Sequence, residues 1–235
     1  MSQKKYIGLD IGSVSVKAVL INERKEILEN HYVRSHGQTV ETFLLVLKDI
    51  FNRTHIDDID GIAITGTGGK LVSELMNIAF INEVVAHSTA TTTLYPEVRT
   101  IIEIGGEDSK LMLIERDAST QQTKVSDFSM NTMCAAGTGS FLDQQATRLG
   151  VAIEKEFGEL ALKSKNPPRI AGRCSVFAKT DMIHLQQEGT PVYDIVAGLC
   201  YAMARNFKSN IGKGKEFLKP IVFQGGVAAN VGMIK

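Results

Sequence analysis

The chain has 235 residues, of which 43% are hydrophobic, and its 26 lysines and arginines equal its 26 aspartates and glutamates. This much apolar material can fill the cores of two modest lobes or one larger domain, which excludes a disordered or fibrous protein. The zero net charge and the lack of a basic run argue against capture of nucleic acid or of an anionic membrane surface.

Strands alternate with helices along the chain. In the first half, apolar patterns predict strands at 6–10, 15–21, 27–33 and 60–65, and a helix at about 39–51 whose apolar face includes Val40 and Leu44. In the second half, they predict strands at 100–104, 109–114, about 124–128 and 220–223, with a long helical region before the last of them. We expect two packed lobes, 1–95 and 96–235, without a flexible linker.

The start of the chain and its cysteines both suggest a location. The first residues run directly into a predicted strand, without the long apolar segment of a secretory signal or membrane span. Three cysteines without short-range pairing fit a reducing compartment better than a disulfide scaffold. We therefore expect a cytoplasmic protein.

One segment occurs twice in the same register, as Leu9–Ile21 and Ile102–Ile114, with a constant offset of 93 (103 − 10 = 105 − 12 = 110 − 17). Each copy has an apolar strand ending in a carboxylate, then a glycine and a polar turn into a second strand. Backbone amides and hydroxyls of such a turn can surround phosphate oxygens, while the carboxylate can hold hydrated Mg²⁺. Two facing copies indicate two lobes that close on one nucleotide. A pair of ordinary β-hairpins in a duplicated fold is the alternative.

A third glycine motif, Gln224–Asn230, follows the predicted strand at 220–223. Ligands of α/β sheets gather at such strand ends, and glycines let an adenine or ribose approach the backbone. A tight strand-to-helix turn would look the same. The sequence holds no Walker A pattern, which excludes the P-loop class. A weaker glycine-rich candidate, Thr65–Lys70, is equally consistent with a plain strand-to-helix loop.

These three elements resemble those of the acetate and sugar kinase, Hsp70 and actin superfamily. The resemblance implies an α/β fold with two related ribonuclease-H-like lobes, each contributing one phosphate hairpin. Because the sequence stops at Lys235, soon after the adenosine turn, we expect the second lobe to be truncated at its C-terminus.

Cys134 and Cys174 each lie just before a predicted helix. The first helix is expected to be capped by Thr138 or Ser140 and to end at Gly150. The second is expected to be opened by Ser175 and to end at Gly189.

The positive end of a helix favours thiolate over thiol, so this placement suits metal ligation. Two cysteines cannot complete a four-ligand site, but a symmetric dimer could share one cluster between two such pairs. Two buried structural cysteines are the alternative. Cys200 lies on an apolar helical stripe and is expected to be buried in the core.

The segments Cys134–Asp143 and Cys174–Lys179 resemble the paired cysteine motifs of the 2-hydroxyacyl-CoA dehydratase activators, the BadF/BadG/BcrA/BcrD ATPase family. The resemblance implies a homodimer sharing one 4Fe-4S cluster, with Cys134 and Cys174 as ligands. It further implies that ATP binding and hydrolysis move helices at the cluster and inject a low-potential electron into a partner dehydratase or reductase. A ferredoxin- or flavodoxin-like protein would supply the electron.

The same resemblance assigns the ATP and Mg²⁺ sites. Asp10 and Asp108 would organise Mg²⁺, and Glu107 stands where many relatives carry glutamine, beside the expected γ-phosphate. A carboxylate there could orient the attacking water but would repel phosphate unless a metal or lysine compensates. The remaining candidates for nucleotide contact are Gly12, Ser13, Val14, Ser15, Lys17, Gly105, Gly106, Lys110, Gly137, Thr138, Gly139, Gly225, Gly226 and Asn230.

The predicted function is therefore an ATPase coupled to electron transfer. One alternative is a small-molecule kinase of the same fold with structural cysteines, which would need a base at an acceptor site. Another is a nucleotide-gated scaffold or filament without catalysis.

Overall fold

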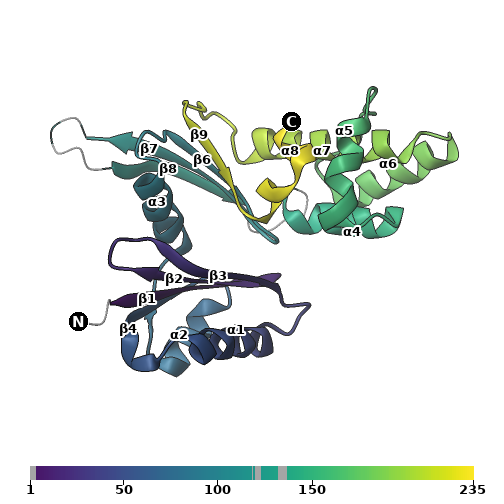
Figure 1. Cartoon of the computed structure of the whole chain (residues 1–235). Helices are drawn as coiled ribbons and strands as arrows, with labels where there is room; N and C mark the ends of the chain where they lie inside the picture. The colour runs from purple at the N-terminus through teal and green to yellow at the C-terminus, as the bar shows by residue number, and fades with distance from the viewer. Residues whose placement is uncertain (1–3, 118, 120–122, 132–136) are drawn as a thin grey trace. The chain divides into compact units, whose positions relative to one another are not determined.

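The computed structural model describes residues 4–117, 119, 123–131 and 137–235 of the chain. The chain divides into two compact units, Met1–Ala90 and Thr91–Lys235, and each contains a mixed sheet with helices packed against it (Figure 1). The lobe boundaries expected at residues 95 and 96 stay a prediction, since a compact unit is not by itself an independent domain.

The first unit is built on a five-stranded sheet in the order β3-β2-β1-β4-β5. The β1–β2 and β2–β3 pairs are antiparallel, whereas β1–β4 and β4–β5 are parallel. Its elements are β1 (Lys5–Ile11), β2 (Ser15–Asn22), β3 (Ile27–Arg34), α1 (Thr39–Arg53), a 3-10 turn (Ile56–Asp58), β4 (Ile59–Thr65), α2 (Gly69–Met76) and β5 (Ala79–Phe80). The division between the units falls within α3 (Glu83–Leu94).

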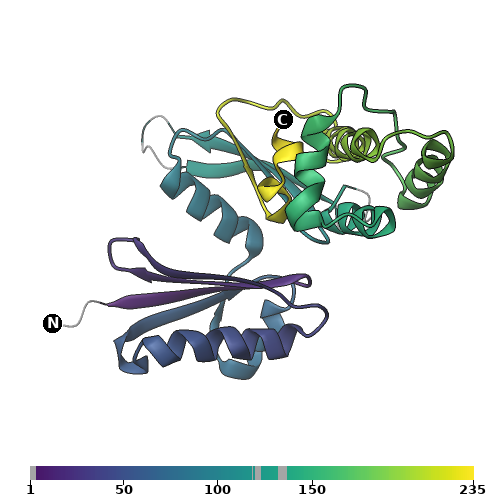
Figure 2. The ribbon, with the colours of Figure 1, turned by 45° about the vertical axis from the view of Figure 1, so that its right-hand side comes forward.

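Alternate residues of β1 and β2 form the core of the first unit because successive side chains of a strand point to opposite faces. They pack against α1, which runs along one face of the sheet (Figure 2). The buried apolar side chains of α1 are Phe43, Val46, Leu47 and Ile50. The predicted apolar face was therefore partly wrong, since Val40 and Leu44 are exposed. Apolar residues cover more of α1 than one stripe, and only packing decides which of them face the sheet.

The second unit repeats the strand order of the first, as β8-β7-β6-β9. The β6–β7 and β7–β8 pairs are antiparallel and β6–β9 is parallel. Its elements are β6 (Thr100–Ile104), β7 (Ser109–Arg116), β8 (Thr123–Asn131), α4 (Gly139–Leu149), a π-helical turn (Ile153–Phe157), α5 (Gly158–Lys163), α6 (Ser175–Gln187), α7 (Val192–Asn210), β9 (Ile221–Gln224), a 3-10 turn (Gly226–Ala229) and α8 (Val231–Ile234). The predicted strands of both units are confirmed apart from small shifts at their ends.

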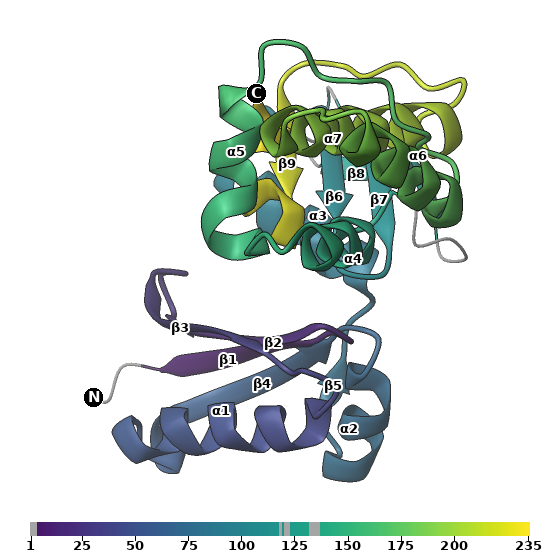
Figure 3. The same cartoon turned by 90° about the vertical axis from the view of Figure 1, so that its right-hand side faces the viewer.

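Helix α7 lies against the sheet of the second unit (Figure 3) and is buried along much of its length. Ile195, Leu199 and Met203 belong to one core cluster with Ile104 and Leu111 of the sheet. None of the helices in the described part of the chain combines the length and the hydrophobicity that spanning a bilayer requires.

Candidate functional site

The turn between β1 and β2 is a tight polar hairpin. The Gly12 amide donates to the Ser15 carbonyl over 3.0 Å and closes the turn. Ser35, just after β3, donates from its amide to the Val14 carbonyl and from its hydroxyl to the Ser13 carbonyl, each over 3.0 Å. These hydrogen bonds fix the backbone of the predicted first phosphate motif.

Asp10 and Lys17 face each other across this hairpin as directly opposed residues of β1 and β2. Lys17 Nζ lies 2.7 Å from Asp10 Oδ2. The Lys17 and Asp10 side chains remain 37% and 27% exposed, so solvent screens their attraction. Both charged groups can therefore exchange this contact for a ligand at the end of β1.

The turn between β6 and β7 has the same construction. The Gly105 amide donates to the Asp108 carbonyl over 2.9 Å, as Gly12 does in the first hairpin. Lys110 Nζ lies 3.1 Å from Glu103 Oε2 and 2.9 Å from Asp108 Oδ1. The Lys110 and Glu103 side chains are only 2% and 6% exposed. The second hairpin therefore contains a buried lysine held between two carboxylates.

The sequence prediction omitted Glu103 from the site, although the duplication could have identified it. The offset of 93 aligns Glu103 with Asp10 and Lys110 with Lys17, and the structure pairs both couples across their hairpins. Asp108, which was chosen instead, aligns with Ser15.

The N-terminus of α4 is bonded to the second turn. The Gly139 amide donates to the Gly105 carbonyl over 2.7 Å, and the Ser140 amide and hydroxyl donate to the Gly106 carbonyl over 2.8 and 2.6 Å. Thr138 is the N-cap residue, as one of the two predicted options required. Because the Gly139 amide is already bonded to the Gly105 carbonyl, the role of Gly139 in this structure is to hold the second turn in place. Glu107 is exposed in the same turn.

Each unit also has a glycine with positive φ just after the strand that pairs in parallel with the first strand of its hairpin. Gly66 follows β4 with φ +95°, and Gly225 follows β9 with φ +91°. A Cβ would lie 2.5 Å from the Ile11 carbonyl oxygen at Gly66 and 2.4 Å from the Ile104 carbonyl oxygen at Gly225. It would also approach the neighbouring strand-end carboxylate, to 2.6 Å and 3.0 Å respectively. The predicted adenosine turn of the second unit and the weaker candidate Thr65–Lys70 of the first unit thus occupy equivalent places, each directly after the corresponding strand.

The rest of the predicted adenosine turn is compact. Gly226 begins the short 3-10 turn, and Val227 within it is buried. Asn230 is the N-cap of α8, where its side-chain oxygen accepts from the Gly232 amide over 3.0 Å.

Cys134 lies outside the described residues, whereas Cys174 lies at the start of α6 in the second unit. Cys174 is the N-cap residue of α6, is partly exposed, and accepts from the Ala178 amide through its carbonyl over 3.0 Å. The expected cap was one residue too late, since Ser175 is already helical. Phe177, in the first turn of α6, is highly exposed.

Cys200 is confirmed as a core residue, because only 5% of it is exposed on the buried face of α7. Burial raises the pKa of its thiol to about 12. Cys174 and Cys200 are both free thiols, and of these two only Cys174 is suitable for metal ligation.

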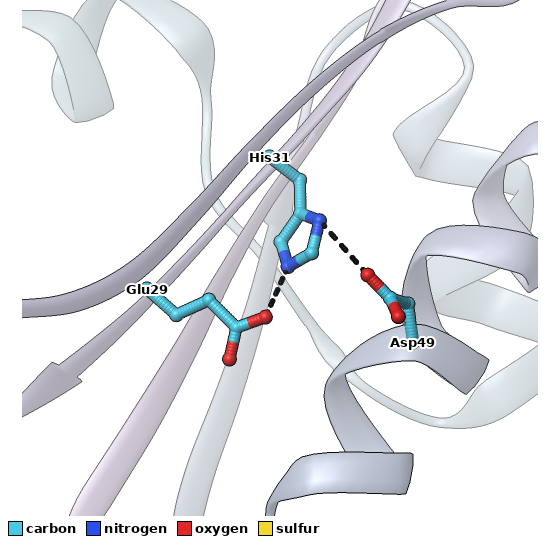
Figure 4. Close-up of side chains that lie close together, drawn as sticks. All are labelled: Glu29, His31 and Asp49. Atoms are coloured by element: carbon cyan, nitrogen blue, oxygen red, sulfur yellow. Dashed lines mark hydrogen bonds and ion pairs between the residues drawn. The ribbon is translucent and has the colours of Figure 1, made fainter.

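A separate ionic cluster joins β3 to α1 (Figure 4). His31 Nε2 lies 2.6 Å from Glu29 Oε1, and His31 Nδ1 lies 3.6 Å from Asp49 Oδ2. Arg53 contacts both carboxylates, with its Nη1 2.8 Å from Glu29 Oε1. Because Arg53 already supplies positive charge, this cluster ties the helix to the sheet without requiring a metal.

Comparison with known proteins gives consistent results for sequence and structure. Residues 7–235 match the model of the BadF/BadG/BcrA/BcrD ATPase family. The 2-hydroxyisocaproyl-CoA dehydratase activator of Clostridioides difficile is 32% identical over 231 residues, which cover 97% of this chain and 83% of the relative.

Two solved structures resemble the fold along nearly the whole chain. The crystal structure of (R)-2-hydroxyglutaryl-CoA dehydratase component A from Acidaminococcus fermentans has a TM-score of 0.88 at 29% identity, covering 98% of this chain and 86% of that one. The 2-hydroxyisocaproyl-CoA dehydratase activator from Clostridium difficile with bound ADPNP has a TM-score of 0.85 at 31% identity, covering 98% and 83%. The chain therefore belongs to the BadF/BadG/BcrA/BcrD ATPase family and has its two-lobed, actin-like α/β fold.

Proposed function

We propose that this chain is an ATP-dependent activator that passes a low-potential electron to a partner 2-hydroxyacyl-CoA dehydratase or a related reductase. The observation that carries the proposal is the similarity, over 98% of the chain, to a dehydratase activator solved with bound ADPNP. The duplicated hairpins provide the backbone turns that such a nucleotide requires.

The two hairpins would divide the work of binding Mg²⁺ and ATP. Lys17 and Asp10 form a partly exposed pair, so we assign Lys17 to the phosphates and Asp10 to the hydrated Mg²⁺. Lys110 already holds two carboxylates, and its role in this proposal is to position Glu103 and Asp108. Asp108 is 21% exposed and remains a second Mg²⁺ candidate.

Glu107 and the glycine turns would complete the nucleotide site. The exposed carboxylate of Glu107 would orient the attacking water, with its charge offset by Mg²⁺. Gly225 would bring the backbone close to the adenosine, while Gly139 and Ser140 keep the second phosphate turn in place and Thr138 caps the helix that carries them.

The environment of Cys174 fits ligation of an iron–sulfur cluster. Its thiol is free and partly exposed, at the N-terminal end of a 13-residue helix, where negative charge is favoured. Val176 and Phe177 beside it are each 65% exposed, which suits a surface that a second subunit covers. We assign Cys134 and Cys174 of two subunits to one shared cluster, which would supply one-electron chemistry at low potential.

The proposal also requires partners. The electron would come from a ferredoxin- or flavodoxin-like donor and would leave for the partner dehydratase or reductase. Such free thiols and a reduced cluster fit the cytoplasm.

The deciding test is iron and acid-labile sulfide content after anaerobic reconstitution. We expect about four of each per dimer, lost in both Cys134→Ala and Cys174→Ala. Cys200→Ala is the matched control and should keep the full content, because Cys200 is in the core. Folded, nucleotide-binding protein without iron would overturn the electron-transfer proposal, and phosphotransfer assays would then test the kinase alternative.

A further inference from the structure

A buried amide on α7 lies between two glycine segments of the second unit. Asn206 is only 2% exposed, and its Nδ2 donates to the Gly172 carbonyl. On the other side, a Cβ at Gly137 would lie 2.8 Å from Asn206 Oδ1. Gly137 has a φ of +101°, so a side chain there would be both strained and obstructed.

The orientation of this amide is fixed by its neighbour one turn along the helix. Asn210 Nδ2 donates to Asn206 Oδ1 over 2.9 Å. Because the oxygen is engaged there, the Asn206 nitrogen points at Gly172. A buried amide is costly unless it is hydrogen-bonded, so these contacts explain how α7 tolerates it.

Gly137 is also bonded to the second phosphate turn. Ser109 is fully buried and follows Asp108 directly, and its hydroxyl donates to the Gly137 carbonyl over 2.7 Å. The turn is therefore linked to Asn206 first by the hydrogen bond from Ser109 to Gly137 and then by the close approach of Gly137 to Asn206.

Gly172 links Asn206 to the cysteine at the start of α6. A Cβ at Gly172 would lie 2.4 Å from the Ala202 carbonyl oxygen, so this backbone is packed directly on α7. Arg205 also donates to the Ile170 carbonyl over 2.9 Å. The segment that ends at Cys174 is therefore attached to the same turns of α7 that carry Asn206.

We propose that Asn206 is a positioning residue that couples the second phosphate turn to Cys174. The inference rests on the proposed function, since it requires a nucleotide at that turn. A displacement of the turn would move Ser109 and Gly137, and Asn206 would transmit it to Gly172 and the start of α6. Packed interiors transmit small shifts of this kind because they deform little.

The test measures how fast iodoacetamide alkylates Cys174 in the iron-free full chain, with and without a non-hydrolysable ATP analogue. Mass spectrometry separates Cys174 from Cys200, which stays nearly unreactive because it is buried. We expect the analogue to change the Cys174 rate by about fivefold or more, the lower end of typical coupling between sites.

Asn206→Asp keeps the size and one oxygen of the side chain but removes the donor to Gly172. We expect it to bind the analogue with unchanged affinity and to lose the change in alkylation rate. Lys208→Ala is the control on the exposed side of the same helix, away from the Asn206 hydrogen bonds, and should keep the change.

Analogue affinity, measured on the same samples, separates the two levels of the proposal. If the parent protein binds no analogue, the proposed function fails and this inference fails with it. If it binds but its Cys174 rate does not change, or if Asn206→Asp keeps the full change, only the coupling role of Asn206 is overturned. Should Asn206→Asp not fold, Ser109→Ala removes the preceding bond, and a full change in that variant would equally overturn the role.

Discussion

The two hairpins share one sequence pattern but place it in different surroundings. In the first, Lys17 and Asp10 are 37% and 27% exposed, whereas in the second Lys110 and Glu103 are 2% and 6% exposed. The backbone closure of the two turns is the same. A repeated motif therefore does not guarantee a repeated role, since burial decides whether a charged pair is available to a ligand.

The difference arises from what surrounds each turn. The second turn receives hydrogen bonds from the N-terminus of α4, and Asp108 provides a second carboxylate for Lys110. In the first hairpin Ser15 stands at the position equivalent to Asp108, so Lys17 has a single carboxylate partner among the described residues. In the proposed function, the first hairpin would therefore offer an accessible charged pair, while the second would hold Glu107 and Asp108 on a frame fixed by buried contacts.

The largest expected effect concerns the two lysines. Lys110→Met would leave the buried Glu103 and the partly buried Asp108 without their common partner, and should cost about 3–5 kcal/mol of unfolding free energy. Lys17→Met breaks a partly exposed pair that solvent screens, and should cost less than about 1 kcal/mol. Urea denaturation of both variants measures the difference.

A double variant sharpens this result. Adding Glu103→Gln to Lys110→Met removes one of the two carboxylate charges that have lost their lysine, and should restore part of the lost stability. Equal costs for Lys17→Met and Lys110→Met would show that the two pairs play the same structural role.

The second prediction concerns nucleotide affinity. Lys17→Met should weaken binding of an ATP analogue about tenfold to hundredfold, because a hydrogen bond to a charged group contributes about 1.5–3 kcal/mol. Lys4→Met is the matched control, since it removes the same charge from the same unit at an exposed pair with Asp60. Isothermal titration calorimetry measures both, and unchanged affinity in Lys17→Met would remove this lysine from the site.

The third prediction tests what the units have in common. Gly66→Ala and Gly225→Ala should each lose about 1–3 kcal/mol more stability than a control glycine, because the new methyl group meets a backbone carbonyl. Gly37→Ala and Gly189→Ala are matched controls, with positive φ but open space around the added methyl group. Thermal or urea unfolding gives the differences. If the two variants lose no more stability than the two controls, the close approach of the backbone carbonyl does not make these glycines necessary for stability.

Much of the fold could be predicted because its signals are local. Alternating apolar residues and a motif repeated at a constant offset are sufficient to predict strands such as β1 and β6. The stripe that contains Cys200 likewise needs only helical spacing. Contacts between distant segments leave no comparable signal. Sequence alone could not show that Lys110 is buried between two carboxylates, or that Asn206 contacts two glycines far from it in the chain.

The smallest expected effect comes from an exposed ion pair in each unit. A hydrogen bond from Arg53 lowers the pKa of Asp49 in the first unit, and one from Lys215 lowers the pKa of Asp127 in the second. Because each folded-state pKa is lowered, the stabilisation is present above the unfolded pKa of about 4 and is lost as the pH falls through the folded value. Arg53→Met and Lys215→Met should return these pKa values toward the ordinary range in a carboxyl NMR titration. Since both pairs are screened by solvent, we expect the two units to respond alike, and a pKa that does not move would show that the pair is not formed in solution.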